Sequence, residues 1–250
     1  MISISIIGAG NVATHLARQF VKLPQIHLQQ MYNRHIDKLK EFESTTEIID
    51  DLKQLKQANI LVIALKDEAI SDFSKKLQYF DSLIVHTSGS VAMSDLQVKR
   101  KGVFYPFQTF SKQVETMDFS QIPLLVEATY AADLQLLKNV AGLLSDNVLE
   151  INSKQRLALH IGGVFAANFV NRLYVEASLI LQENQLSFDL LKPLILEVAQ
   201  KVQDIPPIVA QTGPAYRGDY QIIDKHLSFL TDKQQKQIYR LLTERIVKTQ

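Results

Sequence analysis

A glycine-rich turn stands near the beginning of the chain, where residues 8–13 have the sequence GAGNVA. The spacing G-x-G-x-x-A suits a dinucleotide when it joins a strand to a helix. Gly8 would allow the tight turn, Gly10 would let the backbone approach a diphosphate, and Ala13 would let the helix pack against the sheet. The N–H groups of Asn11 and Val12 would then face the anion at the start of the helix. A purely structural turn is the alternative.

The second predicted strand ends in basic rather than acidic residues. NAD-binding domains usually place Asp or Glu there to bind the ribose hydroxyls. Here Asn33 and Arg34 follow the strand, and the first acidic residue of the chain is Asp37. A guanidinium can bind a 2′-phosphate through two hydrogen bonds, whereas a carboxylate would repel it. We therefore expect NADP rather than NAD, with Asn33 on the ribose, Arg34 on the phosphate and Lys38 adding charge; the alternative is that Arg34 is a solvated surface charge.

Two further strand ends carry residues that could contact a ligand, because ligands of open α/β sheets lie beyond the carboxyl ends of the strands. Leu65 and Lys66 follow one apolar run, and His86, Thr87 and Ser88 end the next. We expect Leu65, Lys66 and Thr87 to contact the cofactor. His86 or Ser88 could transfer a proton. The alternatives are an exposed Lys66 and a buried His86 bonded to a backbone carbonyl.

A long apolar helix predicted in the second half of the chain carries two polar candidates. His160 and Asn168 are eight residues apart, about two turns and roughly one face of a helix. Gly162 and Gly163 lie between them and suggest that a backbone or a ligand approaches closely. His160, like His86 and Ser88, is a candidate for transferring a proton, and Asn168 would orient a substrate. A histidine in the core and an asparagine that joins helices are the alternatives.

Two segments rich in turn-forming or aromatic residues complete the set of candidates. Residues 211–219, QTGPAYRGD, predict an irregular loop in which Arg217 could bind a carboxylate or phosphate. The alternative is a local clamp between Arg217 and Asp219. Residues 104–110, FYPFQTF, are interpreted mainly as core, with Gln108 and Thr109 as candidate polar contacts.

The elements that must position these residues change in type near Asn152. Before it, short apolar runs alternate with helical patterns, which predicts a Rossmann-type doubly wound α/β domain with a mainly parallel sheet over residues 1–151. After it, the patterns are helical, which predicts an all-helical domain over residues 152–250. The expected strands are 2–7, 28–32, 60–65, 83–86, 103–105, 124–127 and 148–151, and the expected helices are 12–21, 37–42, 70–77, 134–144, 154–183, 188–203 and 233–247.

Composition excludes several classes of function. The net charge of +1 gives no general attraction for nucleic acid or acidic membranes. The absence of cysteine excludes disulfides, thiolate metal sites and cysteine nucleophiles, and we expect no metal site. The apolar stretch 157–181 is interrupted by polar and charged residues, so we interpret it as a helix buried in protein rather than a membrane span. The chain also begins without the pattern of a signal peptide, and we expect it in the cytoplasm.

Five motifs in this order resemble a known family over nearly the whole length: GAGN at 8–11, HTSG at 86–89, YPFQTF at 105–110, His160 with Asn168, and GPAYRGD at 213–219. The sequence resembles bacterial Rossmann-like NADP-binding proteins with a carboxyl-terminal domain of unknown function, described as NADP oxidoreductases of the deazaflavin-dependent type. Their architecture is similar to that of pyrroline-5-carboxylate reductase, ketopantoate reductase and 6-phosphogluconate dehydrogenase.

This resemblance implies a 6-phosphogluconate-dehydrogenase-like helical domain that completes a substrate site against the nicotinamide and forms a homodimer. Related 3-hydroxyacid dehydrogenases place a catalytic lysine on the first long helix of that domain. Here the neighbourhood holds His160, and Lys154 lies near the helix start. The lysine mechanism therefore does not transfer directly, and the sequence shows no specific deazaflavin pocket.

We therefore expect an NADP(H)-dependent oxidoreductase that moves a hydride between the nicotinamide and a small, polar, anionic substrate held by Arg217. A non-catalytic NADP(H)-binding sensor or interaction module is the alternative. A flavin or S-adenosylmethionine as the ligand is a third and weaker alternative. Arg34 argues against S-adenosylmethionine, which usually requires a carboxylate at that position.

Overall fold

The computed structural model describes residues 1–114 and 117–248. The chain divides into two compact units, Met1–Phe165 and Ala166–Gln250. The predicted change of fold type at residues 151–152 coincides with the start of helix α4 (Ser153–Gly163), which lies in the first unit.

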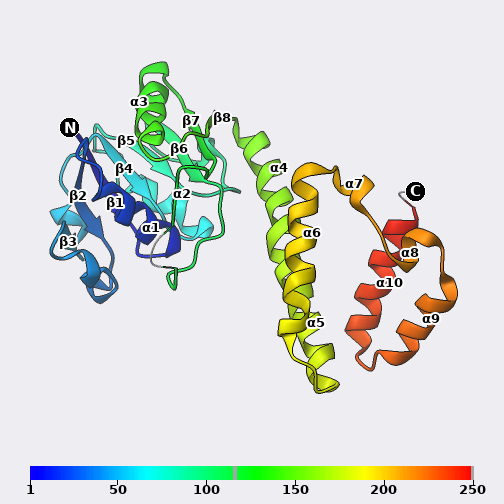
Figure 1. Cartoon of the computed structure of the whole chain (residues 1–250). Helices are drawn as coiled ribbons and strands as arrows, with labels where there is room; N and C mark the ends of the chain where they lie inside the picture. Colours follow the sequence, from blue (N-terminus) through cyan, green and yellow to red (C-terminus); the bar gives the residue numbers. More distant parts are fainter. Residues whose placement is uncertain (115–116, 249–250) are drawn as a thin grey trace. The chain divides into compact units, whose positions relative to one another are not determined.

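The first unit contains an eight-stranded sheet in the order β3-β2-β1-β4-β5-β6-β7-β8 (Figure 1). Neighbouring strands are parallel except β6 and β7, which are antiparallel. The strands are β1 (Ile2–Ile7), β2 (Ile26–Tyr32), β3 (Glu47–Ile49), β4 (Ile60–Ile63), β5 (Leu83–His86), β6 (Lys101–Pro106), β7 (Leu124–Ala128) and β8 (Val148–Glu150). The predicted doubly wound, mainly parallel sheet is confirmed.

Helices cover both faces of this sheet, as alternate residues of one strand demonstrate. Ile6 of β1 packs in one apolar cluster with residues of α1 (Asn11–Phe20) and α3 (Ala131–Gly142). The next residue, Ile7, packs in a second cluster with residues of α2 (Asp67–Lys75) and the turn after it. Because both faces are covered, β4 and β5 are buried throughout, which explains their unbroken apolar sequences.

Short elements of this unit differ from the sequence prediction. Strand β3 was not predicted, because its three residues follow a run of threonines and carry too short a pattern to detect. The helix expected at residues 37–42 is a 3-10 helix, η1 (Ile36–Phe42). Two more single-turn 3-10 helices, η2 (Leu52–Gln54) and η3 (Met93–Asp95), lie in connections that the sequence leaves unassigned.

The second unit is helical. It contains α5 (Val170–Glu183), η5 (Phe188–Leu191), α6 (Lys192–Asp204), α7 (Pro207–Ala210), α8 (Pro214–Arg217), α9 (Tyr220–Phe229) and α10 (Lys233–Val247). A π-helical turn, η4 (Val164–Phe169), joins α4 to α5 where the chain passes from one unit to the other. Helix α9 was not predicted, because Gly218 and the short α8 hide its start.

The long apolar helix is exposed within the single chain. Ser153–Glu183 is the one helix in the described part of the chain that is long and apolar enough to cross a membrane by length and composition, and none of its apolar window is buried. A single helix of this kind is weak evidence for a membrane span, and Arg172 and Glu176 form an ion pair on it. Its exposure shows that the chain alone does not cover its apolar surface.

Candidate functional site

The turn between β1 and α1 has the geometry that a dinucleotide requires. Gly8 has φ +129°, and a Cβ there would lie 2.2 Å from the carbonyl oxygen of Ala64 at the end of β4. Gly10 precedes the first turn of α1 and has no described atom within 4 Å of a Cβ position. No side chain caps this helix and no acidic residue stands in its first turn. The structure therefore leaves open space in front of free N–H groups, as a diphosphate needs.

The next two residues of the turn have different surroundings. The amide nitrogen of the Asn11 side chain donates to the carbonyl of Phe110 over 2.8 Å, so that α1 is attached to the segment after β6. Val12 is half-buried and packs against the apolar cluster beside α1. Their backbone N–H groups, rather than their side chains, are the groups suited to an anion.

At the end of β2 one cation has no protein partner. The side-chain oxygen Oδ1 of Asn33 accepts a hydrogen bond from the backbone N–H of His35 over 2.9 Å, which fixes the turn. The Arg34 guanidinium is exposed and forms no ion pair or hydrogen bond with the residues that the structure describes. Arg18, by contrast, pairs with Glu41 over 3.0 Å. Arg34 therefore remains available for an anionic ligand at this edge of the sheet.

The end of β4 contributes backbone more than side chains. The strand stops at Ile63, two residues before the predicted end, and Lys66 precedes α2 as its N-cap residue. Leu65 is half-buried beneath the apolar cluster that contains α2, and Lys66 is exposed. Their predicted contact with the cofactor stays a prediction.

At the end of β5, His86 is completely buried. Its Nδ1 accepts a hydrogen bond from the N–H of Ser88 over 3.1 Å. Burial lowers the pKa of His86 to about 3, helped by the charge of Arg156 and opposed by the backbone of Ala92. This environment keeps the imidazole neutral and favours a positioning role over proton transfer.

Thr87 and Ser88 are also buried at this strand end. The Ser88 Oγ accepts hydrogen bonds from the N–H groups of Ser90 and Val91, each over 3.0 Å. These bonds hold the loop after β5 in a tight turn, which the small residues HTSGS predict. The turn presents the backbone of Gly89 to the carboxyl edge of the sheet.

The hydroxyl of Tyr105, near the end of β6, lies 2.9 Å from Nδ1 of His160 on α4. A Cβ on Gly89 would lie 2.5 Å from the same Nδ1 and 2.9 Å from the Tyr105 oxygen. The pair and the glycine thus form one close cluster. Tyr105 is not among the residues predicted from the sequence, because the aromatic segment 104–110 is typical of core. Its position as a polar-tipped residue at the carboxyl end of a strand is the signal that could have found it.

Helix α4 is fixed in this position by a buried arginine one turn before His160. Arg156 donates to Glu127 on β7 over 2.6 Å and to the carbonyl of Val91 over 2.5 Å. One turn after His160, a Cβ on Gly163 would lie 2.8 Å from the ring of Phe107. A side chain thus approaches Gly163 where a backbone or a ligand was expected, and no described atom lies within 4 Å of a Cβ on Gly162. One stripe of α4 holds His160 against the sheet edge.

The two remaining candidates lie in the second unit. Asn168 is exposed in the π-helical turn η4. Arg217 is exposed at the end of α8, which is bounded by Gly213 and Gly218, both with positive φ. The irregular loop expected here is thus a short helix between two turns. Asp219 does not clamp Arg217: its carboxylate accepts from the N–H of Ile222 and caps α9.

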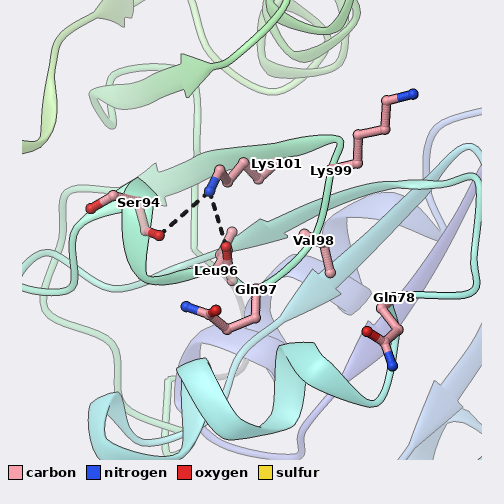
Figure 2. Close-up of a pocket in the computed structure, with 7 residues that line it drawn as sticks. All are labelled: Gln78, Ser94, Leu96, Gln97, Val98, Lys99 and Lys101. Atoms are coloured by element: carbon pink, nitrogen blue, oxygen red, sulfur yellow. Dashed lines mark hydrogen bonds between the residues drawn. The ribbon is translucent and has the colours of Figure 1, made fainter.

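A shallow depression lies elsewhere on the first unit (Figure 2). Its lining includes Lys101, whose ammonium donates to the carbonyls of Ser94 and Leu96 over 3.4 and 3.1 Å. Because Lys101 begins β6, this depression lies at the amino-terminal edge of that strand, opposite the edge that carries Tyr105. It is separate from the candidate cofactor site. No group of acidic, histidine or cysteine side chains suited to a metal ion is found among the described residues.

Comparison with known proteins supports the same assignment. Residues 3–88 match a family profile described as NADP oxidoreductase, coenzyme F420-dependent, and residues 122–246 match a domain of unknown function, DUF2520. A Bacteroides fragilis protein described as a candidate NADP oxidoreductase is 37% identical, with a TM-score of 0.91 over 99% of this chain and 98% of its own. The chain belongs to this family of NADP oxidoreductases. No curated protein sequence matches it significantly.

More distant structures share the fold of this oxidoreductase. A Thermotoga maritima protein is 21% identical, with a TM-score of 0.74 over 98% of this chain and 97% of its own. An imine reductase from Myxococcus stipitatus in complex with NADP⁺ is 16% identical, with a TM-score of 0.64 over 98% and 92%. The expected family, fold class and NADP cofactor are confirmed.

Proposed function

We propose that this oxidoreductase transfers a hydride between NADP(H) and a small, polar, anionic substrate. The observation that carries the proposal is the open, uncapped start of α1 at Gly10, together with the unpaired guanidinium of Arg34. The first feature suits a diphosphate and the second suits a 2′-phosphate. These two features fit the cofactor that the family uses.

The residues that would hold NADP(H) all follow strands whose carboxyl ends form one edge of the sheet. The backbone at Gly8, Gly10, Asn11 and Val12 would bind the diphosphate, and Asn33 and Arg34 would bind the adenosine side. Leu65, Lys66 and Thr87 would line the path toward the nicotinamide. When bound, NADPH supplies the hydride, and the protein supplies orientation and a proton.

His160 is the best-placed candidate for that proton. It is half-buried beside the turn after β5, and its ring is held by Tyr105. His86 and Ser88 would instead shape the turn, because His86 is buried with a low pKa and the Ser88 oxygen is bonded to two N–H groups. Asn168 would orient the substrate, and Arg217 would bind its anionic group through two hydrogen bonds.

The substrate class follows from this division of roles. A proton donor beside a hydride donor suits the reduction of a C=O or C=N bond, and a free guanidinium suits a carboxylate. Structural neighbours include an imine reductase and a reductive aminase, which is consistent with either bond. We therefore propose 2-oxo acids, or the imines they form with amines, as the first substrates to test.

A homodimer through the helical unit is part of the proposal. Within the described residues 166–248, only Ala215, Ile223 and Gln235 are buried. Large apolar side chains are exposed instead, among them Phe229 at 63%. A unit with so little core needs a covering surface, and a second copy of the same apolar helices provides one. Light scattering of the purified protein should give twice the 28.3 kDa chain mass, and a monomer would contradict this. The expected location in the cytoplasm stays a prediction.

The test is calorimetric titration with NADPH and NADH. In Arg34→Ala the Kd for NADPH should rise about 10- to 100-fold, as the loss of a charge-assisted hydrogen-bonded contact implies. The Kd for NADH should stay the same. Lys99→Ala is the matched control, because this exposed lysine lines the depression at the opposite edge (Figure 2) and its loss also removes one positive charge.

Turnover is then followed by NADPH absorbance with pyruvate, glyoxylate and 2-oxoglutarate, each alone and with methylamine. Absence of binding by either nucleotide would overturn the proposed function. Binding of NADPH without turnover of these compounds would overturn the substrate class and favour a non-catalytic sensor or a different substrate.

A further inference from the structure

Resting on the function proposed above, we propose that Tyr105 and His160 form a proton relay. Tyr105 fixes the tautomer of His160 and replaces the proton that His160 gives to the substrate. The proposal starts from the hydrogen bond of 2.9 Å between the Tyr105 hydroxyl and Nδ1 of His160. The two residues come from β6 and α4, so the fold brings them together from 55 positions apart in the sequence.

The surroundings of the pair leave one nitrogen of His160 for a substrate. Nδ1 is bonded to Tyr105, whereas Nε2 has no hydrogen-bond partner among the described residues. The absence of a side chain on Gly89 is what allows the pair to form, since a Cβ there would lie within 3 Å of both polar atoms. Arg156 is bonded to the Val91 carbonyl one turn before His160, and Gly163 lies against the Phe107 ring one turn after it, so that helix α4 is held where it carries His160.

Tyr105 has a proton to give in this relay. Burial raises the pKa of the Tyr105 hydroxyl, so the phenol keeps its proton. In the proposed relay the hydroxyl donates this proton to Nδ1, and the proton of the His160 ring then stands on Nε2. Arg156 on α4 lowers the pKa of Tyr105 and Asp67 at the start of α2 raises it. The positive charge of Arg156 would therefore stabilise a tyrosinate when the proton leaves.

Two protons move in the proposed transfer, one from His160 and one from Tyr105. The Nε2–H bond of His160 breaks and a bond forms between that proton and the substrate oxygen or nitrogen, while the reacting carbon gains the hydride. The O–H bond of Tyr105 breaks and its proton bonds to Nδ1, so that His160 stays neutral and Tyr105 becomes a tyrosinate. After the product leaves, a proton from solvent bonds to Nε2 of His160 and the proton on Nδ1 returns to the Tyr105 oxygen, which restores the starting state of both residues. NADPH is oxidised and the C=O or C=N bond is reduced.

The first test measures the tautomer of His160 by NMR of protein with ¹⁵N-labelled histidine, bound to NADP⁺. Comparison with His160→Gln assigns the signals of His160 among the six histidines. The wild type should show His160 mainly protonated on Nε2. Tyr105→Phe should shift the signals toward a mixture of the two tautomers. Tyr79→Phe is the control, because Tyr79 is 88% exposed and remote from this strand end.

Gly89→Ala is the second variant, which keeps both members of the pair. Its Cβ would lie where the pair needs space, so the same loss of a single tautomer is expected without removal of the hydroxyl. Gly142→Ala, where no described atom lies within 4 Å of the added Cβ, is the matched control. With any compound that the NADPH screen identifies, Tyr105→Phe should lower kcat about 100-fold, at the low end of general acid–base contributions, with the NADPH Kd unchanged.

The outcomes separate the two proposals. A wild type that binds neither nucleotide would overturn the proposed function, and the relay with it. NADPH binding together with an unchanged His160 tautomer in Tyr105→Phe and in Gly89→Ala would overturn the relay alone. A shifted tautomer in both variants, with NADPH binding retained, supports the relay.

Discussion

The two glycines of the first turn should respond to the same substitution in opposite ways. At Gly8 an added Cβ lies 2.2 Å from the Ala64 carbonyl oxygen, and the φ of +129° is one that L residues rarely adopt. Backbone strain of this kind costs about 1–3 kcal/mol. Overpacking against a fixed backbone atom costs about as much again. We expect Gly8→Ala to lose roughly 2–6 kcal/mol of stability, a large fraction of the total for a domain.

Gly10→Ala should instead leave the fold nearly intact. The backbone at Gly10 is extended, with φ −78°, and no described atom lies within 4 Å of the added Cβ. The cost is that of a poorer N-cap residue, about 1 kcal/mol or less. The added methyl group would occupy the space in front of the helix N–H groups. Loss of one charge-assisted hydrogen bond there would raise the NADPH Kd by about 10- to 100-fold.

The assay compares the melting temperature without nucleotide and the Kd for NADPH of both variants. At about 2–4 °C per kcal/mol for a chain of this size, Gly8→Ala should melt at least about 5 °C below the wild type. Gly10→Ala should melt within about 4 °C of the wild type and bind NADPH weakly. Equal destabilisation by the two substitutions, or unchanged NADPH binding in Gly10→Ala, would refute this division of roles.

Two further predictions concern the buried polar groups behind the site. Because the pKa of folded His86 is about 3, against an ordinary value of 6.5, unfolding takes up a proton between these pH values. Stability should therefore fall by up to about 1.4 kcal/mol per pH unit below about pH 6, and His86→Asn should flatten that slope in urea titrations at pH 4–7; a parallel slope contradicts it. Arg156→Met leaves Glu127 and the Val91 carbonyl without their buried partner and should cost about 3–5 kcal/mol by urea unfolding. Arg156→Met combined with Glu127→Leu should recover part of the loss, and equal stability of the single variant and the wild type would contradict the role of the ion pair.

The parts of the fold that the sequence predicts are those encoded by local patterns. Strands β1 and β5 and helix α10 begin and end where the apolar patterns predict them. The glycine turn is equally local, because its requirements come from the backbone of a few consecutive residues. Strand β3 and helix α9 were missed, because local patterns do not define them. Pairing with β2 fixes β3, and the cap from Asp219 fixes the start of α9. The burial expected for the long apolar helix stays a prediction for another reason: composition shows that a surface must be covered, but not by which chain.

The site illustrates why residue type alone does not assign chemistry. His86 and His160 are equal candidates in the sequence, since each stands among small or apolar residues at a plausible position. Packing separates them: His86 is completely buried on β5 beside a buried arginine, which keeps it neutral, whereas His160 is half-buried and bonded to a hydroxyl. Both environments depend on the contacts of α4 with strand ends more than 50 residues earlier, through Arg156 and Val91 and through His160 and Tyr105. The same helix that helps burial to keep His86 neutral therefore places His160 beside the Tyr105 hydroxyl.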